Sequence, residues 1–130
     1  MNAIAYVRYA SKNIEDRVEI GDNPQENAIK EYCTTNHINL CEIFHDIGVS
    51  GSDFERQGWR QLEKFLDGVD GFIELLIVSD YDRISRNTFE GVGKMEFLQN
   101  RYGLTILALS DSRIPNDDEL RRLLLDGSED

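Results

Sequence analysis

The sequence predicts an α/β three-layer sandwich around a mostly parallel sheet of four to five strands. Three observations lead to this fold class: β-prone and helical segments alternate along the chain, one apolar run has the composition of a strand buried on both faces, and 130 residues fit one domain. A hydrophobic share of 40% and a charged share of 30% are typical of a globular protein with a packed core. We therefore expect residues 1–130 to form a single domain.

The N-terminal part of the chain predicts a strand followed by a helix. Residues 3–9 (AIAYVRY) are β-prone and lead into a long polar loop. Pro24 suits the first position of a helix with Asn23 as its cap, and Asn36 and His37 close that helix. Its apolar side chains recur at helical spacing on one face, and they are Ala28, Ile29, Tyr32 and Cys33.

The middle of the chain predicts two strands separated by a loop and a helix. Residues 38–44 (INLCEIF) form the first of these strands, and the Gly/Ser-rich loop that starts at Asp46 is of a kind that carries functional side chains. Residues 72–79 (FIELLIVS) are nearly all apolar, with Glu74 as the exception, which is typical of a strand buried on both faces. The helix between them spans about residues 58–67 and directs four side chains inward: Trp59, Leu62, Phe65 and Leu66.

The C-terminal part predicts a helix, a strand and a short final helix. Asn87 and Glu90 form a pair that resembles a capping box, which starts the first helix. Residues 104–110 (LTILALS) are the next strand. The segment IPNDDELRRLLLDG then predicts a helix capped by Asn116 and stopped by Gly127, with an apolar stripe of Leu120, Leu123 and Leu124.

The net charge of −11 argues against a surface that neutralises many phosphates, because proteins that hold nucleic acid in this way are basic. Binding to a polyanion requires basic side chains concentrated in one place, since salt screens each charge beyond about 8–10 Å. The N-terminus lacks the pattern of a secretory signal, and no apolar run approaches the roughly 20 residues of a membrane span. We expect a cytoplasmic protein that does not act at a membrane.

Two cysteines and two histidines recur at a spacing that suggests a zinc site, namely Cys33, His37, Cys41 and His45. Geometry argues against it. Cys41 and His45 on one strand would stand roughly 13 Å apart, too far to share a tetrahedral ion. The cysteines also lack CxxC spacing, so reduced thiols in a reducing compartment are expected, without a metal or other cofactor.

The predicted topology brings several arginines and carboxylates together. In open parallel sheets a site lies beyond the carboxyl ends of the strands, which selects the loop after Arg8, the loop from Asp46 to Arg56, and residues 82–86. Guanidinium groups fork onto phosphate oxygens and stabilise the charge that develops in phosphoryl transfer. The alternative is that each arginine is an ordinary surface residue beside an acid. The residues concerned are Arg8, Arg56, Arg83 and Arg86, with Asp46 and Asp82.

Four motifs in this order resemble the N-terminal catalytic domain of the serine recombinases, the resolvase/invertase family. They are YVRYAS for the family's Y-x-R-x-S, QENAI for its Gln-led helix, DIGVSGSDFER for D-x-x-x-S-G followed by Arg, and DRISRN for D-R-x-x-R. The resemblance covers roughly residues 3–110. A lone DRxxR would be a weak signal, whereas four ordered matches in fitting structural context are strong.

The resemblance implies a mechanism in which a serine hydroxyl attacks a DNA phosphate without a metal or nucleotide cofactor. The attack leaves a 5′ phosphoserine link and a free 3′ hydroxyl, and the strand is then rejoined to a new partner. Carried over by position, Arg8, Arg83 and Arg86 clamp the phosphate. The remaining motif residues orient these arginines, complete the site or position the first loop: Tyr6, Gln25, Asp46, Ser50, Arg56 and Asp82. DNA and further copies of the chain, as dimers or tetramers, are the implied partners.

The chain departs from the family pattern at the nucleophile, because the serine of Y-x-R-x-S falls at Ala10. In an extended strand Ser11 faces away from Arg8, although a turn starting at residue 10 could redirect it as a substitute nucleophile. Family members usually continue into an oligomerisation helix and a DNA-binding domain, which we do not expect within residues 1–130. Two hypotheses follow: a recombinase catalytic domain without its nucleophile, or a non-catalytic module that binds DNA or a related recombinase.

Overall fold

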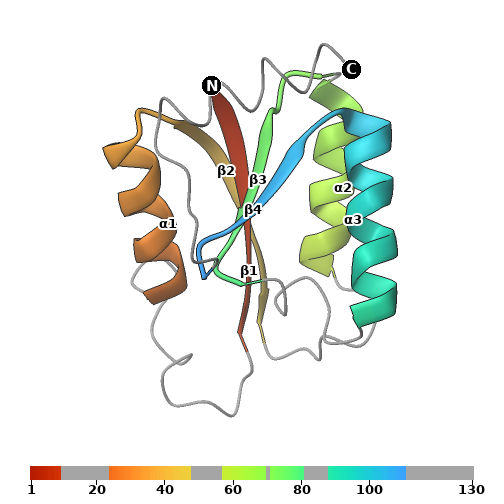
Figure 1. Ribbon diagram of the computed structural model, residues 1–130, viewed down its shortest axis with the longest axis horizontal. Helices are drawn as coiled ribbons and strands as arrows, with labels where there is room; N and C mark the ends of the chain where they lie inside the picture. The colour runs from red at the N-terminus through yellow and green to blue at the C-terminus, as the bar shows by residue number, and fades with distance from the viewer. Residues whose placement is uncertain (10–23, 48–56, 70, 81–87, 111–130) are drawn as a thin grey trace.

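The computed structural model describes residues 1–9, 24–47, 57–69, 71–80 and 88–110 (Figure 1). Strands and helices alternate along these residues. In chain order the elements are β1 (Asn2–Tyr9), α1 (Pro24–Thr35), β2 (Asn39–Ile47), α2 (Gln57–Val69), β3 (Leu75–Val78), α3 (Thr88–Tyr102) and β4 (Thr105–Ala108). None of the helices within these ranges is long and apolar enough to cross a membrane.

The four strands form one parallel sheet in the order β2-β1-β3-β4. Helix α1 covers one face, and α2 and α3 cover the other, as Figure 1 shows. The predicted three-layer α/β sandwich is therefore confirmed. The chain moves from β1 outward to β2 and then returns to the other side of β1 for β3, so the sheet has a topological switch point between β1 and β3.

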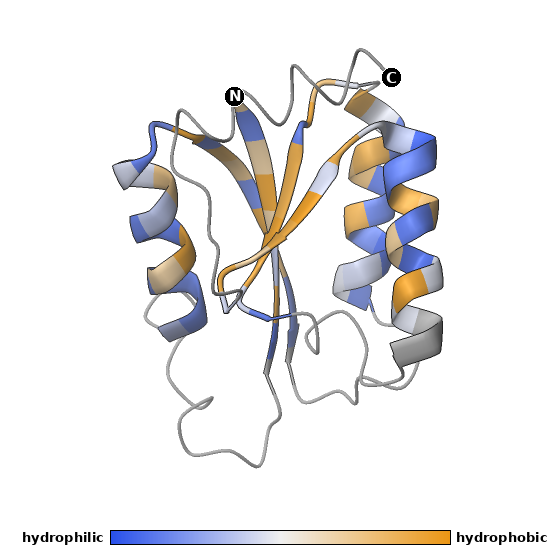
Figure 2. Ribbon diagram, in the orientation of Figure 1, coloured by the Kyte–Doolittle hydropathy of each residue, from blue (hydrophilic) through white to orange (hydrophobic). Residues whose placement is uncertain are grey.

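Strand β1 separates two apolar cores because its successive side chains point to opposite faces. Ala3, Ala5 and Val7 pack on the α1 side, whereas Ile4 and Tyr6 pack on the side of α2 and α3. Strand β3 is buried on both faces, as its apolar run predicts. Figure 2 shows this pattern as apolar strands between helices whose solvent-facing sides are hydrophilic.

A register shift in β2 decides which of its side chains reach each core. Ala3 of β1 pairs with Leu40, but Ile4 pairs with Glu42, so Cys41 is an extra residue on the β2 side. Beyond this irregularity Phe44 packs with the α2 core, while Ile43 packs with the α1 core. The shift thus determines the faces on which the polar residues at the end of β2 lie.

Three boundaries differ from the sequence-based predictions. Strand β2 continues to Ile47, so Asp46 stands on a strand and not in the following loop. Strand β3 starts only at Leu75, because Gly71 has a φ of 80° and the Phe72 amide bonds to the Val69 carbonyl in a turn after α2. Phe72 consequently remains 52% exposed. Strand β4 is also shorter than residues 104–110.

The buried face of α1 differs from the expected one at its first turn. Ile29 and Cys33 are buried as predicted and Tyr32 is half-buried, but Ala28 is exposed. Gln25 and Glu26 are buried in its place. Their polar groups have partners on the sheet, which makes their burial possible. The predicted caps Asn23 and Asn87 and the helix near the C-terminus lie outside the described residues.

Candidate functional site at the carboxyl edge of the sheet

The carboxyl ends of β1, β2 and β3 and the first turns of α1 and α2 meet at one edge of the sheet, the lower edge in Figure 1. We call this edge the carboxyl edge. Polar side chains approach it from four elements, and they are Arg8 of β1, Asp46 of β2, Ser79 after β3, and Gln25 of α1. The parallel topology therefore collects residues that are far apart in the sequence.

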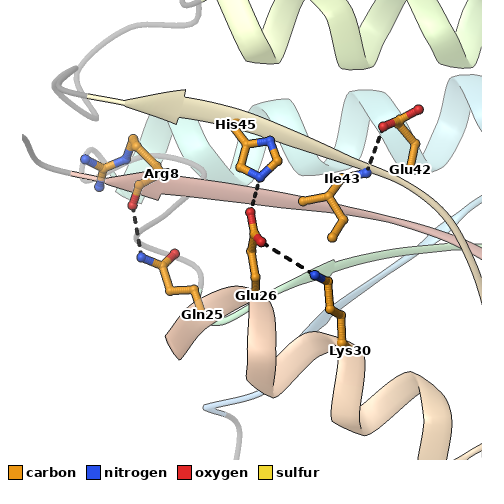
Figure 3. A network of polar contacts seen from close by, with 7 residues as sticks. All are labelled: Arg8, Gln25, Glu26, Lys30, Glu42, Ile43 and His45. Atoms are coloured by element: carbon orange, nitrogen blue, oxygen red, sulfur yellow. Dashed lines mark hydrogen bonds and ion pairs between the residues drawn. The ribbon is translucent and has the colours of Figure 1, made fainter. Parts of the chain in front are cut away.

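Gln25 bridges the two strands on either side of the switch point. Its Nε2 donates a hydrogen bond to the carbonyl oxygen of Arg8 at 3.2 Å. The Ser79 hydroxyl lies 3.5 Å from Oε1 of Gln25 and 3.3 Å from Oδ2 of Asp80, and its single proton can be donated to either oxygen. Figure 3 shows the bond between Gln25 and Arg8. Since Gln25 is only 8% exposed, one buried amide connects the end of β1 to the end of β3 through the start of α1.

Arg8 is a fully charged side chain held inside the protein at the carboxyl edge, with 2% of its surface exposed. It stands two residues after Tyr6 on β1 and shares the face of Tyr6, so it projects toward the α2 side of the sheet, opposite to α1. A buried guanidinium is costly unless it has polar partners, and it offers five donors. The structure therefore places a buried cation at the carboxyl edge.

The carboxylate of Asp46 accepts three hydrogen bonds at the start of α2. The amides of Gly58 and Trp59 donate to it at 2.8 and 3.0 Å, and the Tyr6 hydroxyl donates at 2.7 Å. Asp46 thus satisfies free amides of the first helical turn and places a negative charge at the positive end of the helix dipole. Its described contacts anchor α2 to the sheet, which is a supporting role.

Glu26 and His45 form a second polar contact beside the carboxyl edge, on the α1 side of the sheet. The Glu26 carboxylate contacts Nε2 of His45, and its other oxygen lies 3.8 Å from Nζ of Lys30 (Figure 3). Sequence reasoning missed this pair, as well as Ser79. An acidic residue in the first turn of a helix was a signal that could have pointed to Glu26, but its partner depends on the register of β2.

Seven predicted site residues lie outside the described part of the chain: Ala10, Ser11, Ser50, Arg56, Asp82, Arg83 and Arg86. The strands and helices that flank these segments along the chain end or begin at the carboxyl edge. Tyr9 and Pro24 flank the first segment, and Ile47 and Gln57 flank the second. The chain therefore enters and leaves these segments beside Arg8, Gln25 and Asp46.

The cysteines and histidines considered for zinc occupy different surroundings. Cys33 is buried in the α1 core, and its burial raises the pKa of the thiol to about 11. His37 lies in the turn after α1 with a φ of 55°, and His45 contacts Glu26. Within the described ranges, no three side chains of His, Cys, Asp or Glu are grouped so as to hold a metal ion.

A comparison with known protein families shows to which family the chain belongs. Residues 3–127 match the family described as the resolvase N-terminal domain. The chain belongs to the resolvase family. Four residues that the motif resemblance selected lie at or near the carboxyl edge, and they are Tyr6, Arg8, Gln25 and Asp46. A search among curated proteins gave no match.

Solved structures of serine recombinases and integrases share the resolvase fold of this chain. The N-terminal catalytic domain of TP901-1 integrase superposes with a TM-score of 0.70 at 16% identity, covering 99% of this chain and 95% of that one. The C-terminal catalytic domain of ISC1926 TnpA, an IS607-like serine recombinase, gives 0.67 at 24% identity, with coverage of 97% and 79%. A resolvase family site-specific recombinase from Streptococcus pneumoniae gives 0.65 at 21%, with coverage of 99% and 86%.

Proposed function

We propose that this chain is the catalytic domain of a site-specific DNA recombinase in which alanine occupies the nucleophile position. One observation carries the proposal: the buried cation Arg8 lies near the end of β1 beside the switch point of a resolvase fold, two residues before position 10 in the sequence. Gln25 holds the backbone of Arg8 at this place. A DNA phosphate bound by Arg8 would therefore lie beside the end of β1.

The proposed reaction is a transfer of the DNA phosphate to a serine oxygen and back. In the cleavage step an Oγ–P bond forms, the P–O3′ bond breaks, and the proton of the serine hydroxyl is transferred to the leaving 3′ oxygen. In the rejoining step a 3′ hydroxyl of the partner strand attacks phosphorus and releases the serine. Several guanidinium groups stabilise the charge of the phosphorane-like transition state, so the reaction itself needs no metal.

Ala10 removes the attacking oxygen from this scheme, because a methyl group has no lone pair to offer phosphorus. The proposal assigns Arg83 and Arg86 to the phosphate together with Arg8. Asp82 then orients these arginines or assists the leaving group, while Ser50 and Arg56 complete the site. Under this proposal the chain binds a scissile phosphate but does not cleave, unless Ser11 acts in place of residue 10.

A covalent trapping experiment tests the proposal. The unmodified chain and its Ala10→Ser variant, each fused to a DNA-binding tail, are offered a nicked DNA that retains covalent 5′ adducts. We expect an adduct with Ala10→Ser, none with the unmodified chain, and none with Ala10→Ser combined with Arg8→Ala. An adduct of the unmodified chain that disappears in Ser11→Ala would assign the nucleophile to Ser11.

A non-catalytic module that binds DNA or a related recombinase is the second candidate. The absent nucleophile and the charge of −11 favour it, because neither suits a chain that turns over DNA by itself. Failure of Ala10→Ser to form any adduct, with the variant folded and bound to the DNA, would support this candidate. For either function we propose a cytoplasmic protein of mobile DNA that works as a dimer or tetramer.

A further inference from the structure

The carboxylate of Glu26 in the first turn of α1 is deeply buried, since its side chain is 1% exposed. A buried carboxylate is stable only when positive or hydrogen-bonding groups compensate for the lost water. Lys30 is a weak compensating group, because its Nζ is 3.8 Å away and the side chain is 47% exposed. His45, which is 22% exposed and comes from β2, makes the closer contact. The contact with His45 therefore attaches the first turn of α1 to β2.

Gln25, the neighbour of Glu26, attaches the same turn to the other two strands of the carboxyl edge. Its amide contacts the Arg8 carbonyl of β1 and the Ser79 hydroxyl that follows β3. The two residues share one rigid helical turn, so a displacement of Glu26 moves Gln25 with it. The position of Gln25 on the backbone of Arg8 thus depends on whether Glu26 is held against His45.

We propose that Glu26 and His45 are a positioning pair that sets the Gln25 bridge. The buried carboxylate of Glu26 contacts the imidazole of His45, so the pair fixes the first turn of α1 against β2. Lys30 of α1 also lies beside the pair, while Asp46 and Arg8 project to the opposite face of the sheet.

The two histidines of the chain provide a matched control. His37 lies at the other end of α1, in the turn after Thr35, and His45 is the second histidine. Any property that depends on the pair must persist in His37→Asn and change in His45→Ala. His45→Gln retains a side-chain donor, so it should restore part of that property.

Nuclear magnetic resonance of the side-chain amide of Gln25 tests the positioning role directly. We expect the Gln25 signals of His37→Asn to match those of the unmodified chain. In His45→Ala and Glu26→Gln, these signals should move toward those of an exposed amide and exchange faster with solvent. If Glu26→Gln does not fold, His45→Ala alone decides. Gln25 signals that are unchanged in a folded His45→Ala variant would falsify the inference.

A binding measurement extends the test to DNA, and this arm rests on the proposed function. At low salt, the affinity of His45→Ala for a short duplex should be about two- to fivefold lower than that of the unmodified chain, the range expected of a partly exposed pair. His37→Asn should keep the affinity of the unmodified chain. Equal affinity of the two variants contradicts the DNA arm. Absence of binding by the unmodified chain contradicts the proposed function, while the Gln25 signals still decide the positioning role.

Discussion

At the scale of single residues, Asp46 connects the sheet to the start of α2 through a very close approach of the two backbones. The approach is possible because residue 58 is glycine. A Cβ at this position would stand 2.7 Å from the His45 carbonyl carbon and 2.8 Å from Oδ2 of Asp46, which no real side chain accepts. Tyr6 also packs its ring edge-on against Trp59, with centroids 5.0 Å apart. The supporting part of the site is therefore specified by sterics as well as by hydrogen bonds.

Gly58→Ala should lower the free energy of unfolding by about 2–3 kcal/mol, because the added methyl group forces α2 away from β2. Gly68→Ala is the matched control in the same helix, since a Cβ there meets nothing within 4 Å. That variant should be unchanged or more stable by up to about 1 kcal/mol. Urea unfolding of both variants measures the difference. Equal stability of the two would show that α2 can shift at no cost.

At the scale of elements, each helix is attached to its neighbours by a buried apolar stripe and a few polar contacts at its rim. Glu63 of α2 accepts from the Trp59 indole at 2.8 Å and lies 2.5 Å from Nζ of Lys94 in α3. On the other face, Ile29 and Cys33 of α1 pack against the alternate side chains of β1 and β3. The elements that bear the site are thus held by ordinary core packing.

Burial of Cys33 predicts a loss of stability in alkaline solution. The folded pKa of about 11 lies above the ordinary thiol pKa of 9.0, so the stabilising difference is complete below the unfolded pKa and lost as pH rises toward 11. The loss amounts to about 2–3 kcal/mol. Unfolding of the unmodified chain and Cys33→Ala at pH 8 and 11 measures it. The stability advantage of the unmodified chain should shrink by that amount; a constant advantage would contradict the assignment.

At the scale of the whole molecule, the described basic side chains are divided between the helices and the carboxyl edge. Lys94 and Arg101 pair with Glu63 and Asp67 on the helices, away from that edge. Arg8 instead lies buried at the carboxyl edge. If the chain binds DNA as proposed, its overall charge of −11 opposes the approach of the polyanion.

Residues 1–130 alone should therefore bind a short duplex weakly, with a Kd of about 10⁻⁴ M or higher at physiological salt. The salt dependence should be shallow, because few phosphates are neutralised. Fluorescence anisotropy at 50 and 200 mM salt checks both values. Submicromolar binding with a steep salt dependence would contradict this prediction. It would mean that the chain has a basic surface despite its net charge of −11.

Much of the architecture is predictable from the spacing of apolar residues along the chain, because this spacing differs between strands and helices. The apolar run 72–79 indicated a strand buried on both faces, and Pro24 indicated the start of α1; both were confirmed. The end of β2 and the start of β3 were wrong by a few residues. The turn at Gly71 and the pairing of β2 with β1 set those boundaries, and neither is visible in local composition.

The sequence by itself determined the fold class, the resolvase relationship and the absence of a serine at position 10, because these depend on residue types and their order. Only the tertiary structure decided that Gln25 bridges β1 and β3, that Asp46 caps α2, and that Glu26 is buried against His45. The physical reason is the register shift at Cys41. An extra residue in one strand reverses the faces of all the side chains that follow, and local sequence patterns do not record it.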